Sequence, residues 1–263
     1  MKNKSVKKNI SAIIQARTDS KRLPNKIFLE IKSKPLIWWL VRNLKKSIYI
    51  NEVILATTDN KSDDKLADYC KKNLQIKVFR GSETDVLDRV TKAAIFNNVE
   101  IILECFGDSP LLDQNLIDEF IFEFLSLNKK GLHCLTNSFK KTYPAGMEIL
   151  IYKTSSLKKL NSIVKKNDIL REHVGFNFCR FKNKFNIKNK IAKKNFNFPN
   201  FYIEVDTLND FYFLRKLINS FEKISLINLE NIIKVIKKKK LFKINENENR
   251  RWKVLSQKFC KEF

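Results

Sequence analysis

The first half of the chain alternates between short apolar runs and segments with apolar residues at helical spacing. Buried strands are predicted for four apolar runs, at residues 10–16, 52–57, 76–79 and 100–106. Helices are predicted between and after them, at residues 35–48, 63–73, 85–97 and 113–127. This order favours parallel strands joined by right-handed crossovers. We therefore expect an α/β fold with a mostly parallel sheet flanked by helices on both faces.

The second half of the chain is less regular. Strands are predicted at residues 132–136, 147–152 and 201–205, and helices at residues 168–179, 207–221 and 229–238. We expect residues 1–245 to form one domain, in which residues 132–192 make a smaller lobe. Residues 246–263 are expected to form a basic C-terminal tail.

Polar clusters follow the predicted strands. They are QARTDSKRLPNK after the first strand, TTDN after the second, FRGSETD after the third, GDSP after the fourth and EVD at the late strand. Ligands of parallel α/β sheets bind beyond the carboxyl ends of the strands. The sequence therefore predicts a ligand site at this edge of the sheet.

The chain is strongly basic, with 52 Lys and Arg against 28 Asp and Glu and a formal net charge of +24. A polyanion partner is one interpretation. Compositional bias is the other, and it is favoured because the basic residues spread along the whole chain. The aromatic residues follow core periodicity and are not interleaved with basic residues as stacking platforms. A non-catalytic protein that binds nucleic acid stays open as an alternative.

Cysteine usage and the lack of membrane signals both favour a cytoplasmic protein. The five cysteines form no CxxC pair and their number is odd, which argues against a disulfide framework or a zinc ribbon. We expect most of them to be buried, reduced thiols. Gln15 and Arg17 interrupt the first apolar run too early for a signal peptide. No apolar stretch approaches the ~20 residues that cross a bilayer, so no membrane association is expected.

The first polar loop, residues 15–26, carries the chemistry of phosphate binding. It offers Arg17, Lys21, Arg22 and Lys26 between a buried strand and a helix. Arginine matches phosphate oxygens with two hydrogen bonds, and lysine supplies a compact charge. Ser20 and backbone N–H groups can add donors. We interpret this segment as a triphosphate-binding loop; an exposed basic loop is the alternative.

Two carboxylates stand at predicted strand ends. Asp108 follows the fourth strand, and its carboxylate can hold Mg²⁺ against triphosphate oxygens because Asp113 is better placed to cap the next helix. Asp206 ends the late strand, where it can serve either as a metal ligand or as the N-cap of the following helix. If that strand alternates, Glu204 points to its opposite face, so we assign Glu204 no role.

The string QARTDSKRLPNKIF resembles the signature loop of the cytidylyltransferase family that includes spore-coat polysaccharide biosynthesis enzymes. That family is related to acylneuraminate and ketodeoxyoctulosonate cytidylyltransferases. GDSPLLD, RGSETDVLDR, TYPAGMEI, REHV and VDTLND resemble further segments of the family, so the resemblance covers about residues 10–240. It implies a Rossmann-like nucleotide-diphospho-sugar transferase fold. Asp19 stands where the family usually has glycine.

The resemblance implies a role for each matching residue. Catalytic roles fall to Arg17, Arg22, Lys26 and Asp108, and Mg²⁺ would be held by Asp108 and Asp206. The nucleotide would also contact Gln15, Ala16, Ser20, Thr57, Asp59, Arg80, Gly81 and Asp85. The acceptor would meet Tyr143, Gly146, Glu148, Arg171 and His173 in the smaller lobe, which could also support a homodimer.

By this resemblance the chain is expected to move CMP from CTP onto an acidic sugar of the ulosonic or nonulosonic type, for surface polysaccharide or glycan biosynthesis. A nucleotidyltransferase that uses another nucleoside triphosphate or a small phosphorylated acceptor is an alternative. A metal-dependent glycosyltransferase is also conceivable, although it would normally carry a D-x-D motif after a strand, and none lies in the right place.

Overall fold

The computed structural model of the chain describes residues 9–250, 252, 256 and 258–260. The basic start at residues 1–8, over which no signal peptide was predicted, lies outside the described residues. So do residues 251, 253–255, 257 and 261–263 of the predicted tail.

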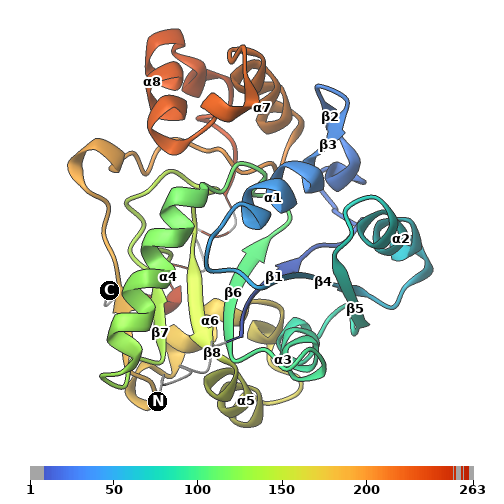
Figure 1. Ribbon diagram of the computed structural model, residues 1–263, viewed down its shortest axis with the longest axis vertical. Coiled ribbons are helices and arrows are strands. Elements are labelled where there is room, and N and C mark those ends of the chain that lie inside the picture. Colours follow the sequence, from blue (N-terminus) through green and yellow to red (C-terminus); the bar gives the residue numbers. More distant parts are fainter. Residues whose placement is uncertain (1–8, 251, 253–255, 257, 261–263) are drawn as a thin grey trace, which may run out of the picture.

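A seven-stranded sheet in the order β5-β4-β1-β6-β8-β7-β9 forms the centre of the molecule (Figure 1). Its strands are β1 Ile10–Gln15, β4 Glu52–Thr58, β5 Lys77–Gly81, β6 Ile101–Phe106, β7 Cys134–Thr136, β8 Leu150–Lys153 and β9 Ile187–Asn189. Neighbours among β5, β4, β1 and β6 pair in parallel, and β8 runs antiparallel to both β6 and β7. The predicted mostly parallel sheet is confirmed.

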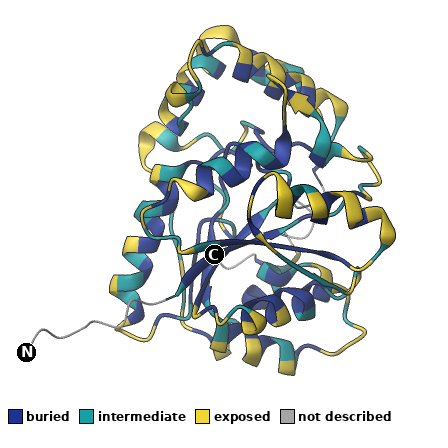
Figure 2. Ribbon diagram, turned by 45° about the vertical axis from the view of Figure 1, so that its right-hand side comes forward, coloured by how far each residue is buried: buried dark blue, intermediate teal, exposed yellow. Residues whose placement is uncertain are grey.

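Helices cover both faces of this sheet and bury two apolar cores (Figure 2). One core joins α1 Leu36–Lys45, α2 Asp64–Lys72 and α4 Gln114–Asn128, and continues into α7 Leu208–Asn219 and α8 Leu229–Lys239. The other joins α3 Val86–Phe96, α5 Thr154–Ile163 and α6 Val174–Arg180. Ala12, Ile13 and Ile14 of β1 are fully buried between the layers, as a continuous apolar run requires of a strand covered on both faces.

Shorter elements connect these layers. A small antiparallel pair, β2 Glu30–Ile31 and β3 Lys34–Pro35, precedes α1. The 3₁₀ helices are η1 Lys26–Phe28, η2 Lys61–Asp63, η3 Ile169–Glu172, η4 Lys182–Lys184, η5 Lys194–Phe196, η6 Ile224–Leu226 and η7 Leu241–Ile244. The small pair, α5 and β9 were not predicted from the sequence pattern.

Two predictions for the second half are wrong in detail. Residues 201–205 form no regular strand; a single parallel bridge joins Tyr202 to Ala145. The reason is that the Val205 N–H bonds the carbonyl of Asp108 instead of continuing that pairing. The helix predicted at residues 168–179 is divided into η3 and α6, because His173 between them has a non-helical backbone with φ −125° and ψ 76°.

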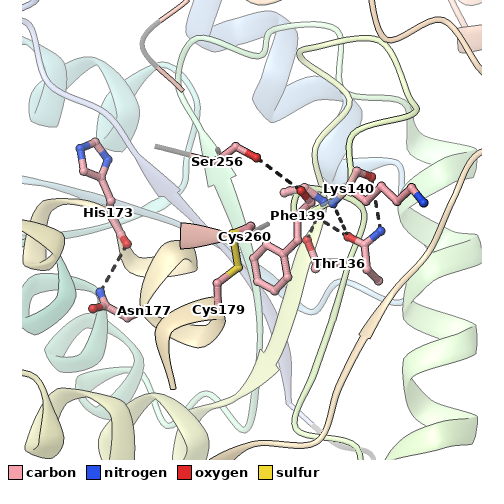
Figure 3. Close-up of a disulfide and its surroundings, with 10 residues drawn as sticks. Thr136, Phe139, Lys140, His173, Asn177, Cys179, Ser256 and Cys260 are labelled. Carbon is pink, nitrogen blue, oxygen red and sulfur yellow. Dashed lines mark hydrogen bonds between the residues drawn. A yellow bond between two sulfur atoms is a disulfide. The ribbon is translucent and has the colours of Figure 1, made fainter. Parts of the chain in front are cut away.

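The prediction for the cysteines holds for three of the five residues and is wrong for two. Cys70, Cys105 and Cys134 are buried and unbridged. Cys179 of α6 and Cys260 form a disulfide (Figure 3). They are 81 residues apart in the sequence, so their spacing gives no sign of the pairing, which arises only when the chain folds back onto α6.

Within the described residues, no helix is both long and apolar enough to cross a bilayer.

Candidate active site

The first loop is shaped by a buried hydrogen-bond centre at its base. Thr18 donates its N–H and its hydroxyl to the Asp63 carboxylate, both at 2.7 Å. The N–H groups of Ser20 and Asn25 then bond the Thr18 carbonyl, and Asn25 turns the chain into η1 with a left-handed φ of 56°. This arrangement projects the basic side chains over the ends of the strands. Thr18 and Asp63 were not assigned this role from the sequence.

A cavity of about 480 Å³ opens at the carboxyl ends of β1 and β6. Ten of the predicted site residues line it: Gln15, Ala16, Arg17, Ser20, Arg22, Lys26, Asp108, Glu148, His173 and Asp206. We call Arg17, Arg22, Lys26 and Asp108 the sheet-edge half of this cavity. Lys141, Glu148, Glu204 and Trp252 form its loop half.

The two predicted metal ligands meet around one ammonium group. The Nζ of Lys26 lies 3.3 Å from Asp108 Oδ2 and 2.8 Å from Asp206 Oδ1. Lys26 also donates to the Val205 carbonyl at 2.8 Å, and Arg22 pairs with Asp206 at 2.6 Å. Residues far apart in the sequence therefore converge at one point of the cavity.

Local capping leaves both carboxylates available for this cluster. Asp113 caps α4 by accepting the Leu116 N–H at 2.9 Å, so Asp108 has no capping role. Thr207, and not Asp206, is the N-cap of α7, where it forms a capping box with Asp210. The alternative interpretation of Asp206 as a helix cap is therefore wrong.

Gly107 allows the first loop to approach the loop that bears Asp108. Its N–H bonds the Gln15 carbonyl at 2.9 Å. A Cβ at this position would lie 2.8 Å from the Cβ of Ala16 and 3.0 Å from Ile27 Cδ1. Any larger residue would force the first loop away from β6 and separate Lys26 from Asp108.

Charge and burial set the protonation behaviour of this cluster. Burial raises the pKa of Asp108, and the charge of Lys26 offsets this only in part. Burial also acts to raise the pKa of Asp206, but Lys26 and Arg22 outweigh it and lower that pKa. In return, the two carboxylates overcome the burial of Lys26 and raise its pKa.

The carboxylate pair has the donor chemistry of a magnesium site. Asp108 and Asp206 offer hard oxygen ligands within reach of a single cation, because both carboxylates contact the same Lys26 ammonium. No group of three or more His, Cys, Asp or Glu side chains among the described residues could hold a metal by itself. Phosphate and water oxygens would complete the coordination, as is usual for Mg²⁺.

The loop half is an electrostatic network of its own. Glu148 accepts a hydrogen bond from the Gly146 N–H and pairs with Lys141, both at 2.7 Å. Gly146 has a φ of 93°, and a Cβ there would lie 2.7 Å from the Glu204 nitrogen, so only glycine lets the two segments meet. Burial, and then the charge of Glu148, raises the pKa of Glu204 to about 8.

Several cavity residues were missed or misplaced by sequence reasoning. Glu204 was expected to point to the opposite face of a strand, yet it lines the cavity together with Asp206, since residues two apart on extended backbone point to the same side. Lys141 and Trp252 were not assigned. The basic pair before Tyr143 was an available signal for Lys141, whereas nothing in the sequence pattern pointed to Trp252.

Other predicted contacts lie outside the cavity. Thr57 is buried against Asp63, and Asp59 is exposed beside it. Arg80 bonds the carbonyls of Thr58 and Asn60 and pairs with Asp64 at 2.5 Å. The cavity-lining residues also do not include Gly81, Asp85, Tyr143, Gly146 and Arg171.

Asp85, Arg171 and Tyr143 have structural partners instead. Asp85 caps α3 by accepting the Asp88 N–H at 2.9 Å and pairs with the buried Arg171 at 2.8 Å. Tyr143 packs edge-on against Phe120 in the core. His173 does reach the cavity, where burial lowers its pKa and favours the neutral imidazole. Arg89, which is buried, lines the cavity as well.

Comparison with known proteins places this geometry in a family. A family model described as Cytidylyltransferase matches residues 11–254. An uncharacterised protein of Methanocaldococcus jannaschii is 32% identical over 249 residues, which are 93% of this chain and 96% of the relative. The spore coat polysaccharide biosynthesis protein SpsF of Bacillus subtilis is 28% identical over 213 residues, 80% of this chain and 86% of the relative.

Partial relatives and solved structures agree with this match. The 3-deoxy-manno-octulosonate cytidylyltransferase of Geobacter sulfurreducens is 32% identical over 113 residues, 43% of this chain and 44% of the relative. The structure of a cytidylyltransferase from Leptospira borgpetersenii superposes with a TM-score of 0.84 at 32% identity, covering 92% of this chain and 99% of that one. The chain is a nucleotidyltransferase that belongs to the cytidylyltransferase family.

Proposed function

We propose that the chain transfers CMP from CTP to a hydroxyl group of an acidic sugar and releases pyrophosphate. The observation that carries this proposal is the convergence of Lys26 and Arg22 with Asp108 and Asp206 at the carboxyl edge of the sheet. Cationic side chains and paired carboxylates in one cavity are what phosphoryl-type transfer needs, because catalysis there depends on positioning and charge stabilisation.

The sheet-edge half would bind the triphosphate. Arg22 and Lys26 now pair with Asp206, and a bound triphosphate would share these cations through its own oxygens. Arg17 is held at the cavity by Glu83 at 3.2 Å and Glu172 at 3.1 Å, so its guanidinium is already oriented for a third anion. A hydroxyl oxygen of the acceptor would bond the α-phosphorus while the bond to the pyrophosphate oxygen breaks and the hydroxyl proton is lost to solvent.

Magnesium held by Asp108 and Asp206 would neutralise phosphate charge when bound. The family description, Cytidylyltransferase, supports CTP as the nucleotide, and the structure of CMP:2-keto-3-deoxy-manno-octonic acid synthetase with CTP shares the fold at a TM-score of 0.59. The residues that would orient the metal and the nucleotide are the four that converge in the cavity, namely Arg22, Lys26, Asp108 and Asp206.

The loop half would bind the acceptor. Lys141 supplies a cation for a sugar carboxylate, and Glu148 and Glu204 offer acceptors or, where protonated, donors for sugar hydroxyls. Support for an acidic acceptor comes from the named substrates of the octulosonate relatives. The name of the Bacillus relative supports a place in surface polysaccharide synthesis. Arg171 pairs with Asp85 and does not line the cavity, so we do not include it among the proposed acceptor contacts.

The test is pyrophosphate release with each of the four nucleoside triphosphates, Mg²⁺ and a panel of acidic, neutral and phosphorylated sugars. Mass spectrometry should detect a CMP conjugate with an acidic sugar and no conjugate with the phosphorylated ones. Faster release with another triphosphate, or with a phosphorylated acceptor, would replace this assignment by the corresponding alternative. Binding of nucleic acid that needs no Mg²⁺, without pyrophosphate release, would exclude the enzyme.

A further inference from the structure

The loop half of the cavity is completed by residues from the far end of the chain. Trp252 lines the cavity, while Ser256, Phe259 and Cys260 contact the elements behind it. We call these four the C-terminal contact residues. The family match ends at residue 254, so Cys260 lies beyond the part of the chain that the family model describes.

Trp252 connects the charged groups of the loop half. Its indole N–H donates to Glu204 Oε1 at 2.9 Å. The ammonium of Lys141 lies over the same indole, 3.3 Å from the ring centroid, and pairs with Glu148. A cation held between an aromatic face and a carboxylate has few alternative positions. Trp252 therefore fixes where Lys141 and Glu204 present their polar groups to an acceptor.

Attachments to the rest of the molecule lie on both sides of Trp252 in the sequence. On one side, the fully buried Arg250 makes two hydrogen bonds to Asp210, at 3.0 and 2.7 Å. On the other side, Cys260 is bonded to Cys179, and Ser256 donates to the Phe139 carbonyl at 3.4 Å (Figure 3). The first attachment does not depend on redox state, whereas the second is a covalent bond that a thiol reductant can break.

The disulfide reaches the cavity through α6. Cys179 lies in this short helix, whose first residues Val174, Gly175 and Phe176 line the cavity next to His173. Phe259 packs on Phe176 with ring centroids 6.5 Å apart. The bond therefore ties a wall of the cavity to Cys260, which follows Trp252 in the chain.

We propose that Trp252 is a positioning residue for the acceptor and that the Cys179–Cys260 disulfide makes acceptor binding dependent on redox state. This rests on the proposed function for the identity of the acceptor. The two thiols lose two protons and two electrons to a small disulfide oxidant, such as oxidised glutathione, which becomes two thiols. Dithiothreitol reverses the reaction. The oxidised enzyme holds Trp252 over Lys141, and the reduced enzyme releases it.

The first experiment compares KM values for acceptor and CTP in oxidised and reduced enzyme. Reduction should raise the acceptor KM about tenfold, because Lys141 and Trp252 must then be ordered during binding, and should leave the KM for CTP unchanged. Cys260→Ser should have the reduced KM with or without dithiothreitol. Cys70→Ala, which removes a buried cysteine of α2, should keep the response to dithiothreitol. Equal acceptor KM values in both redox states would overturn the proposal.

Variants of Trp252 separate positioning from folding. Trp252→Phe keeps an aromatic face for Lys141 but loses the N–H that bonds Glu204, so its acceptor KM should lie between those of wild type and Trp252→Ala. Both variants should keep the CTP KM and the wild-type melting temperature within a few degrees. A CTP KM that rises together with the acceptor KM would show a general loss of structure and contradict the positioning role.

A second experiment needs neither substrate. Thiol titration of the denatured, oxidised protein should find three thiols, those of Cys70, Cys105 and Cys134. The emission of Trp252, obtained by difference from Trp252→Phe, should shift to longer wavelength on reduction. Five thiols after oxidation, or an emission that ignores dithiothreitol, would overturn the redox dependence. Because these readouts use no CTP or sugar, they stay decisive even if the proposed reaction is wrong.

Discussion

On one side of the cavity the functional side chains follow strands of the parallel sheet, whereas on the other they come from segments that no regular strand holds. Arg17, Arg22 and Lys26 follow β1, and Asp108 follows β6, its neighbour in the sheet. Lys141 and Glu148 lie in the loop between β7 and β8, and Glu204 and Trp252 come from still later in the chain.

On the proposed function, the half held by the sheet binds the nucleotide and the less constrained half binds the acceptor. Parallel pairing of β1 with β6 brings two loops to the same edge with little freedom, and Gly107 sets their spacing. The loop half depends on single contacts such as the Gly146–Glu204 approach and the Arg250–Asp210 pair. Loops positioned by a rigid scaffold tolerate change better than the scaffold does.

Asp108→Asn should have the largest effect, since it removes the carboxylate of the sheet-edge half. Loss of one group that stabilises phosphate charge should lower kcat about 10³-fold. Steady-state kinetics with titrated Mg²⁺ would measure this, and calorimetry should show weaker binding of Mg²⁺ with CTP. The acceptor KM should not change. Activity near the wild-type level would mean that Asp108 does not take part in the reaction.

Glu104 lies below the cavity, where β1 meets β6, and predicts a pH effect on folding. It is fully buried and accepts hydrogen bonds from Gln15 and from the Tyr152 hydroxyl at 2.6 Å. Burial raises its pKa from 4.5 to about 7. The folded state thus keeps a proton that the unfolded chain has already lost between pH 4.5 and 7. Stability should fall by on the order of 3 kcal/mol as the pH rises through this range.

Urea unfolding of wild type and Glu104→Gln at pH 4.5 and pH 8 would measure this effect. The variant cannot ionise at this position. The difference between its free energies of unfolding at pH 4.5 and pH 8 should therefore be much smaller than in wild type. Glu100→Gln, at an exposed position just before β6, should keep the wild-type difference. An unchanged slope in the Glu104 variant would show that other groups cause the pH dependence.

Arg22→Ala tests whether the nucleotide is bound by residues that line the cavity rather than by residues that only match the family pattern. Loss of this guanidinium should lower kcat/KM for CTP about 10²-fold. Arg80→Ala is the matched control, because Arg80 was also predicted to bind the nucleotide but bonds Asp64 and two loop carbonyls outside the cavity. We expect its kinetics with CTP to stay near wild type. Equal losses in both variants would extend the site to β5.

Glu148→Gln should act on the other half of the cavity alone. It keeps the shape of the side chain but removes the charge that holds Lys141 at 2.7 Å. The acceptor KM should rise about tenfold, as expected for one charged hydrogen bond, while the KM for CTP stays unchanged. Competition kinetics with both substrates varied would separate the two. A loss confined to the CTP KM would reverse the assignment of the two halves.

The sheet-edge half could be predicted from the sequence because strand order and the rule for ligand position were sufficient. The predicted ends of the four strands lie within two residues of the observed ends, and the loops that carry Asp108 and Lys26 followed from them. Arg80 stays a predicted nucleotide contact that does not line the cavity; its side chain bonds the carbonyls of its own neighbourhood, which no pattern of strands reveals. Its position near the end of β5 could be predicted from the sequence, whereas the direction of its side chain could not.

The loop half could not be predicted because it depends on contacts between segments distant in sequence. Glu204 was left without a role, although it lies two residues before Asp206 and shares its side of the chain; the contacts of residues 201–205 with two different loops were not visible in the sequence. Trp252 lies in a segment without hydrophobic periodicity, and its partners Lys141 and Glu204 are fixed only in the folded chain. The disulfide was missed for the same reason.

Asp19 should have the smallest effect on activity; it places a negative charge beside the basic residues of the sheet-edge half. It is exposed, lines the cavity and receives a long hydrogen bond of 3.5 Å from Ser62. The backbone there is not left-handed; Asn25 has that conformation in this loop. The family's usual glycine is therefore not needed for conformation, and the cost of Asp19 is electrostatic repulsion of the triphosphate.

Asp19→Gly and Asp19→Asn should both lower the KM for CTP, each by about threefold at low salt, and the gain should shrink as ionic strength rises. Equal gains identify the charge as the cause. A gain in the glycine variant alone would mean that the loop must adopt another conformation when the nucleotide binds. Weaker CTP binding in both variants would show that the Asp19 carboxylate contributes to the site, as an additional contact to the metal or the ribose.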